Sequence, residues 1–158
     1  MIYYRILGIS ETATQEQVYK SYREKVKKLR AAKRWGGREA GDRYRKIVQA
    51  YSVLSAPQLR KEYENFLRQN RTNIQREEVF NSLFQFALKT RWKGKAREII
   101  KESLKAFQEV ERDELADAII LAAERYIIEM ELEPFPISEN KSTRLFNRPR
   151  PWRRLFMK

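Results

Sequence analysis

The sequence predicts an all-α fold. Apolar residues recur at spacings of three and four along most of the chain, which marks one face of a helix, and the alternation typical of strands is nearly absent. Glycine and proline occur only five times each, mainly at breaks between periodic segments. The 158 residues are 42% hydrophobic and include three Trp, eight Tyr and eight Phe, enough apolar side chains to build a core.

The first periodic segments predict a short helix followed by a long one. Residues 3–7 form a helical turn that Gly8 ends, because glycine readily adopts the left-handed conformation found after a helix C-terminus. Residues 14–17 then have the form of a capping box, with Thr14 and Gln17 as its two partners. The long helix that follows has a packed face, formed by Val18, Tyr22, Val26 and Leu29.

The same helix carries a cationic stripe on another face. Its members lie three or four residues apart: Lys20, Arg23, Lys27 and Arg30. One interpretation is a docking face for an acidic surface, and the other is an ordinary solvated helix face. Both interpretations stay open at the level of the sequence.

A loop over residues 31–41 contains a basic, aromatic patch. Its central residues are Lys33, Arg34 and Trp35, followed by two glycines. Trp35 is a candidate anchor for a protein partner, with packing against the chain's own helices and stacking on a nucleic-acid base as alternatives. A phosphate-binding P-loop is excluded, because no Lys-Ser/Thr pair follows the glycines.

Two more helices complete the first part of the chain. The next apolar stripe comprises Tyr44, Ile47, Val48, Tyr51 and Leu54, and it runs antiparallel to the previous helix if the connection is short. Ser55 is expected to be the N-cap of the following helix, with Pro57 in its first turn. That helix has its own apolar residues, Leu59, Tyr63, Phe66 and Leu67.

The middle of the chain predicts a second helical unit with three stripes. They comprise Val79, Phe80, Leu83, Phe84, Ala87 and Leu88; then Ala96, Ile99, Ile100, Leu104 and Phe107; then Leu115, Ala118, Ile119, Ala122, Tyr126, Ile127 and Met130. Asp113 is expected to cap the third helix. Because Ile120, Leu121 and Ile128 lie on further faces of that helix, we expect it to be buried on two sides, by another helix alone or by another helix and another chain.

Charge divides the chain into three parts. The net charge is +13, with a pI near 10.1. Residues 1–76 carry +11, residues 77–133 carry −4 and residues 134–158 carry +6. The partner is therefore expected to be acidic, either a protein surface or RNA.

The last segment is aperiodic and mixes arginine with aromatic residues. Its candidate partner-binding residues are Arg148, Arg150, Trp152, Arg153 and Arg154. Such segments become ordered on RNA or on acidic protein surfaces, and the alternative is a solubilising end.

Composition also excludes several kinds of chemistry. The chain has no Cys and no His, which removes disulfides, thiolate nucleophiles, zinc fingers and serine-protease triads. Acidic pairs such as Asp113 with Asp117 are read as helix-end and surface charges. We therefore expect no enzyme, no cofactor, no small-molecule substrate and no membrane span, in a soluble protein of the cytoplasm or of an organelle matrix or stroma.

The first part of the chain resembles a J-domain, the DnaJ-type co-chaperone module. The residues that carry the resemblance are Tyr3-Tyr4-Arg5-Ile6-Leu7-Gly8-Ile9, Ala13-Thr14, Ser21-Tyr22-Arg23, Ile47 through Pro57, and Arg60-Lys61-Glu62-Tyr63-Glu64. The resemblance implies a short first helix, an antiparallel pair of long helices and a short fourth helix.

One departure from the family pattern bears on function. J-domains that activate an Hsp70 ATPase carry a His-Pro-Asp tripeptide where the second helix meets its loop, and here that place falls on Arg30, Ala31 and Ala32. J-like domains without the tripeptide occur in a mitochondrial import-motor subunit and in division proteins of cyanobacteria and plastids, where the scaffold serves as a docking surface. The resemblance therefore implies that Hsp70 stimulation is lost.

Together these patterns predict three regions and one function. Residues 1–69 form the J-like domain, a helical hairpin with short flanking helices; residues 70–133 form a small helical unit; residues 134–158 are an irregular basic tail. We expect a non-catalytic adaptor or scaffold that docks onto a larger protein assembly without stimulating Hsp70. The alternatives are an RNA- or ribonucleoprotein-associated component and a regulatory co-chaperone that pairs with an active J-domain protein.

Overall fold

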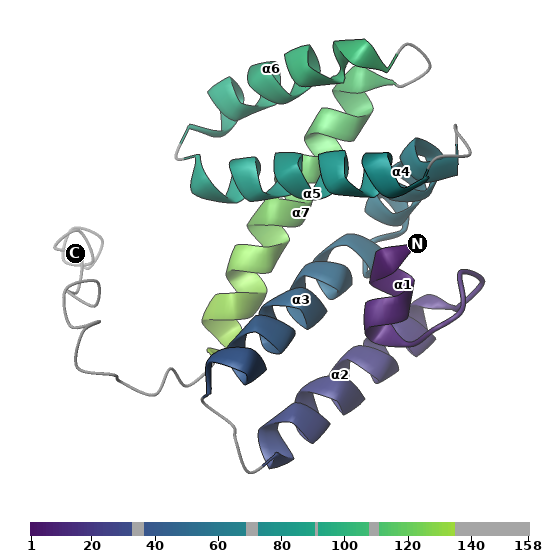
Figure 1. The fold of residues 1–158 in the computed structure, drawn as a ribbon, viewed down its shortest axis with the longest axis vertical. Helices are drawn as coiled ribbons and strands as arrows, with labels where there is room; N and C mark the ends of the chain where they lie inside the picture. The colour runs from purple at the N-terminus through teal and green to yellow at the C-terminus, as the bar shows by residue number, and fades with distance from the viewer. Residues whose placement is uncertain (33–36, 69–72, 91, 108–110, 135–158) are drawn as a thin grey trace, which may run out of the picture.

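Every regular element in the described part of the chain is a helix, which confirms the predicted fold class. The computed structural model describes residues 1–32, 37–68, 73–90, 92–107 and 111–134. In chain order (Figure 1), the elements are α1 (Ile2–Leu7), α2 (Gln15–Ala31), α3 (Arg38–Leu54), α4 (Pro57–Arg68), α5 (Asn73–Lys89), α6 (Lys93–Ser103), the 3-10 helix η1 (Leu104–Ala106) and α7 (Arg112–Leu132).

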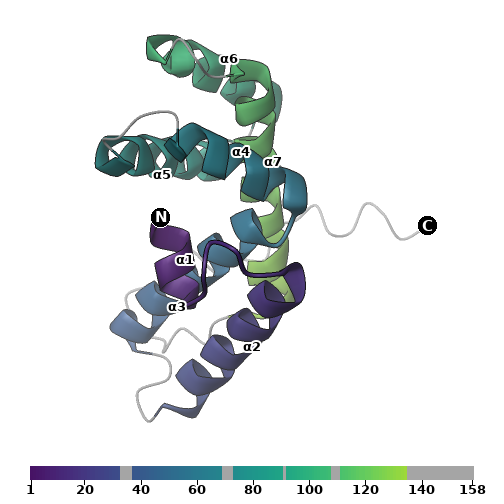
Figure 2. The ribbon, with the colours of Figure 1, turned by 90° about the vertical axis from the view of Figure 1, so that its right-hand side faces the viewer.

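The helices form two groups that α7 joins. Helices α2 and α3 lie side by side and run in opposite directions, with α1 packed against both (Figure 1). Helix α7 runs along most of the length of the molecule and contacts α3, α4, α5 and α6 (Figure 2). Its C-terminal half therefore lies on the hairpin, and its N-terminal half lies on α5 and α6.

The start and stop signals of the first two helices are confirmed. Gly8 follows α1 in the left-handed conformation, with φ 70° and ψ 38°, and its N–H donates to the carbonyl of Arg5 at 3.1 Å. Both hydrogen bonds of the capping box are present at the start of α2, with N–O distances of 2.8 Å and 3.2 Å between Thr14 and Gln17. These devices satisfy amide and carbonyl groups that a helix end leaves free.

Two predicted helix caps are wrong. Helix α4 begins at Pro57, so the residue before it is Ala56, and Ser55 is instead the C-cap of α3. The Ser55 hydroxyl accepts a hydrogen bond of 2.6 Å from Arg125 of α7. Helix α7 begins at Arg112, which places Asp113 inside its first turn, where the carboxylate forms ion pairs with Arg97 and Lys101.

A single hydrophobic core extends through both groups of helices. The ring of Phe80 on α5 lies 5.0 Å from that of Tyr63 on α4 and 6.1 Å from that of Tyr3 on α1, measured between centroids. The Tyr3 hydroxyl also donates a 2.6 Å hydrogen bond to Asn81 on α5. The core therefore crosses the boundary that we place after residue 69, and the division into separate units stays a prediction.

The residues of the predicted apolar stripes are buried or partly buried, with two exceptions. Ile99 and Ile127, which we expected to face inward, are 40% and 37% exposed. Helix α7 is buried against four other helices, yet several of its apolar side chains remain exposed. None of the helices in the described ranges is long and apolar enough to cross a membrane.

Candidate partner-binding face

The cationic stripe lies on the outer surface of α2. Lys20, Arg23, Lys27 and Arg30 are all exposed, whereas Val18, Tyr22 and Val26 on the same helix are buried. The ring of Tyr22 stacks on that of Tyr51 from α3, with centroids 4.0 Å apart. The packed face thus fixes the orientation of α2, and this orientation presents the four cations outward.

Two of these cations hold the end of α7. Arg23 and Arg30, two helical turns apart, each form an ion pair with Glu133, the residue after the last turn of α7. The Arg30 Nη2 to Glu133 Oε2 distance is 2.9 Å, and the hydrogen bond with Glu133 raises the pKa of Arg23 above its usual value. Since a helix C-terminus carries partial negative charge, the two cations also favour this end of α7.

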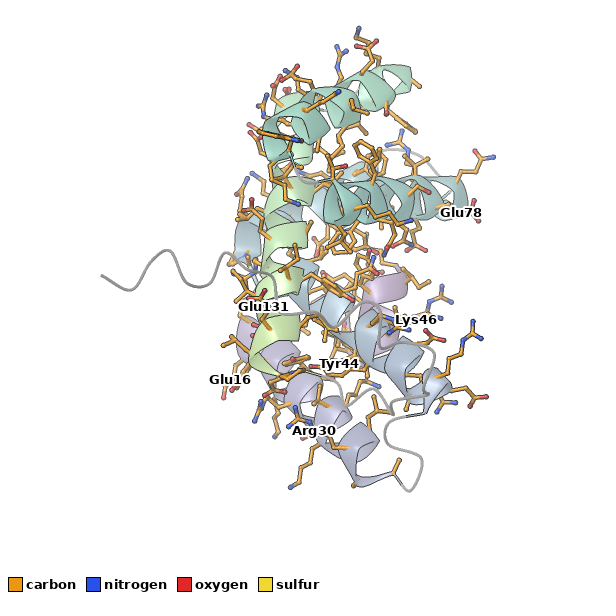
Figure 3. All side chains as sticks on the ribbon, turned by 90° about the vertical axis from the view of Figure 1, so that its left-hand side faces the viewer. Glu16, Arg30, Tyr44, Lys46, Glu78 and Glu131 are labelled. Carbon is orange, nitrogen blue, oxygen red and sulfur yellow. The ribbon has the colours of Figure 1, made fainter. Side chains whose placement is uncertain are left out.

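A third contact fixes the backbone of Glu133. The hydroxyl of Tyr44, from α3, donates a hydrogen bond to the Glu133 carbonyl. Burial raises the pKa of Tyr44, and the Glu133 carboxylate raises it further, so the hydroxyl stays protonated as a donor at neutral pH. In Figure 3, Arg30 and Tyr44 lie where α7 meets the hairpin. The end of α7 is therefore fastened to both long helices.

The remaining two cations have no ion-pair partner among the described residues. Lys27 lines a shallow hollow of about 270 Å³ together with Glu24, Val26 and the two arginines. Lys20 lies on the same helix, about two turns before Lys27. This part of the stripe is available to an acidic partner, whereas Arg23 and Arg30 are already engaged with Glu133.

The three residues that the resemblance aligns with the family tripeptide, Arg30, Ala31 and Ala32, lie at the end of α2. Helix α2 ends at Ala31, and Ala32 follows in an extended conformation, with φ −68° and ψ 138°. The two alanine side chains offer neither a donor nor an acceptor, and the Arg30 guanidinium is bound to Glu133. These three residues thus provide no imidazole, no proline ring and no carboxylate.

The other predicted partner-binding residues lie outside the described residues. This applies to Lys33, Arg34 and Trp35 in the loop after α2, and to Arg148, Arg150, Trp152, Arg153 and Arg154 in the last segment. Both basic, aromatic patches stay predictions.

Sequence reasoning missed Glu133. One signal pointed towards it, because residues 77–133 carry −4 and follow a segment that carries +11. Opposite net charges in adjacent segments favour contact between them. The signal names neither residue of the pair, since that requires knowing that α7 returns to the hairpin.

Comparison with known proteins assigns the first part of the chain. Residues 2–64 match the family model of the DnaJ domain. The chain is 39% identical over 64 residues to the chaperone protein DnaJ of Porphyromonas gingivalis, and 42% identical over 66 residues to that of Chlamydia abortus. It is 41% identical over 64 residues to the chaperone protein DnaJ of Anaplasma marginale.

The similarity covers a limited part of each protein. It includes 40% to 42% of this chain and 17% of the length of each of these three relatives. Helices α5 to α7 lie beyond the matched residues. The comparison with solved structures gives no significant match.

Proposed function

We propose that this chain, whose residues 2–64 form a DnaJ domain, is an adaptor that docks onto a protein assembly without stimulating an Hsp70 ATPase. A DnaJ domain implies protein interactions of the co-chaperone type. The finer proposal is carried by one observation: Arg30, Ala31 and Ala32 occupy the place where stimulating J-domains carry His-Pro-Asp. The imidazole, the rigid proline turn and the carboxylate are absent together.

The contact with Glu133 supports the same proposal. If an Hsp70 bound to α2, it would have to displace the Glu133 carboxylate from Arg23 and Arg30. In the described part of the chain, only Lys20 and Lys27 are unpaired cations of the stripe. An ion pair that is already formed within the molecule competes with one formed across an interface. The stripe is therefore weakened as an Hsp70 site.

An Hsp70 ATPase assay with the full chain tests the proposal. We expect the steady-state hydrolysis rate of a bacterial Hsp70 to stay at its basal value over a titration of the chain. A stimulating DnaJ serves as the positive control in the same buffer. A rate that rises with the concentration of this chain contradicts the proposal.

A regulatory co-chaperone is the second candidate, favoured by the unpaired Lys20 and Lys27 on an otherwise intact DnaJ-domain helix. The same assay separates the two candidates when an active DnaJ is already present. An adaptor leaves the stimulated rate unchanged, whereas a regulator that pairs with DnaJ or occupies its docking site lowers it.

A further inference from the structure

A second basic surface lies on the opposite face of α2. Helices α1, α2 and α3 border a hollow of about 480 Å³ whose floor is aliphatic, formed by Ile6, Leu29 and Ile47. Its rim carries four cations, Lys25 and Lys28 from α2 and Arg43 and Lys46 from α3. At 100° per residue, Lys25 and Lys28 point away from Arg23 and Arg30. We call this hollow the hairpin groove.

No described residue neutralises the rim cations of the hairpin groove. None of the four forms an ion pair with a described residue, although several other cations of the chain do. Four like charges around one apolar floor repel one another, and a carboxylate placed between them relieves that repulsion. The groove therefore suits an occupant that has a row of apolar side chains with acidic side chains beside them.

Helix α7 itself has this chemistry on its outer face. Leu121, Ile128 and Leu132 are 49%, 54% and 70% exposed, and their spacings of seven and four place them on one face of the helix. Glu124 and Glu131 flank them, are exposed and form no ion pair with a described residue. We call this surface the α7 ridge.

The α7 ridge is held in place before any partner arrives. The contacts of Glu133 with Arg23, Arg30 and Tyr44 fasten the C-terminal end of α7, and Arg125 is bound to Ser55. A preorganised helix loses little conformational entropy on binding. The ridge is therefore presented as a rigid surface.

We propose that the α7 ridge of one copy of this chain binds in the hairpin groove of another. The groove offers an apolar floor with a cationic rim, and the ridge offers an apolar line with acidic flanks. Glu131 and Lys46 lie on opposite sides of the molecule (Figure 3). The interface is thus heterologous, and repeating it gives head-to-tail assemblies that end in a ring or an open chain.

Other anionic occupants satisfy only part of these observations. RNA phosphates would neutralise the rim of the groove but leave its aliphatic floor and the α7 ridge exposed. An anionic lipid surface would attract the groove and repel Glu124 and Glu131. A second copy covers both surfaces at once. The proposal does not rest on the proposed function, because it requires nothing of an Hsp70, although Ala32 at the end of α2 also lines the hairpin groove.

Paired charge reversals test the proposal. The groove variant is Lys28→Glu with Lys46→Glu, and the ridge variant is Glu124→Lys with Glu131→Lys. We expect the wild type to sediment with a molecular mass that rises with protein concentration, and more weakly so at high salt. Each variant alone should stay monomeric. In the groove variant the rim retains no net charge to attract the acidic ridge, and in the ridge variant a cationic ridge meets the cationic rim. An equimolar mixture of the two should form a one-to-one complex, because the unchanged ridge of the groove variant fits the unchanged groove of the ridge variant.

Matched controls keep the result interpretable. The control variant, Lys61→Glu with Lys95→Glu, has the same net charge as the groove variant. Its two changes lie at exposed positions away from both surfaces, so it should associate like the wild type. Circular dichroism checks that each variant folds, and the neutral pairs Lys28→Gln with Lys46→Gln and Glu124→Gln with Glu131→Gln replace any variant that does not. A wild type that is monomeric at every concentration overturns the proposal, as does a mixture of the reversed variants that fails to associate. Binding of an RNA oligonucleotide or an anionic vesicle by a monomeric wild type overturns it as well.

Discussion

The DnaJ-domain region and the helices that follow it are held together by different means. In residues 2–64 the helix ends are closed by local devices, such as Gly8 and the Thr14 capping box, and the hairpin closes over aromatic and aliphatic side chains. Helix α7 is held by contacts between residues far apart in the chain, such as those of Glu133 and Arg125. A family scaffold is thus retained by local signals, while a second region covers part of its surface through a shared hydrophobic core and polar contacts between residues distant in the chain.

The aromatic contacts between the two regions, around Phe80, give the largest expected effect. Phe80 is 2% exposed and contacts Tyr3 and Tyr63, so Phe80→Ala leaves a cavity at the boundary. We expect the free energy of unfolding to fall by about 3–5 kcal/mol in urea titrations. The control is Trp92→Ala, at a side chain 78% exposed, which should change it by less than about 0.5 kcal/mol.

The Phe80 experiment also tests whether the two regions unfold together. Since they share a core, the wild type should unfold in one transition by fluorescence and by circular dichroism. Two separate transitions in the wild type would show that the regions are independent, which contradicts the shared core.

A second prediction concerns the inside of the DnaJ-domain region. Arg60 donates hydrogen bonds of 2.7 Å to the Tyr4 hydroxyl and of 2.6 Å to the backbone carbonyls of Glu11 and Ala13, and its side chain is 14% exposed. Arg60→Ala should lower the free energy of unfolding by about 2–3 kcal/mol, because these acceptors lose a charged donor. Arg60→Lys should recover only part of it, since a lysine lacks the planar fork. Full recovery by lysine would show that charge alone matters.

A third, smaller effect is expected at the contact between the regions. Glu133→Ala removes two ion pairs whose arginines are about half exposed, so the loss should be about 1 kcal/mol or less and should shrink at high salt. A double-mutant cycle with Arg30→Ala isolates the coupling between the two side chains. A coupling energy near zero at low salt would show that Glu133 does not fasten α7.

The smallest effect is a dependence on pH. Burial raises the pKa of Glu62 above its ordinary value of 4.5, and the nearby Glu114 raises it further. The folded state therefore favours the protonated form, and this contribution to stability is lost as pH rises from 4.5 through the raised pKa. Glu62→Gln should raise the melting temperature slightly at pH 7 and leave it unchanged below pH 4.5. An equal gain at both pH values would point to a cause other than ionisation.

The sequence predicts local features of the structure better than contacts between distant residues. The short helix, the Thr14 box and the hairpin depend on neighbouring residues, and all three are confirmed. Ser55 and Asp113 fit the pattern of an N-cap, but Arg125 holds the Ser55 hydroxyl, while Arg97 and Lys101 hold the Asp113 carboxylate. At both positions, contacts with residues distant in the sequence outweigh the preference of the side chain for an N-cap position.

The candidate site was predicted only in part for the same reason. Helical spacing identifies the stripe on α2, since all four of its members come from one helix. Glu133 joins two of them through a contact between residues more than 100 positions apart, which no local pattern encodes. The exposure of Ile127 likewise depends on which faces of α7 the other helices cover.

The most direct test of the central claim is to put the tripeptide back. Arg30→His, Ala31→Pro and Ala32→Asp restore the family residues at the end of α2, and the ATPase rate of a bacterial Hsp70 is measured with this variant and with the wild type. Our account predicts no stimulation by the wild type, a measurable gain in the triple variant, and a further gain when Glu133→Ala releases Arg23. Equal stimulation by the wild type and the triple variant would contradict it.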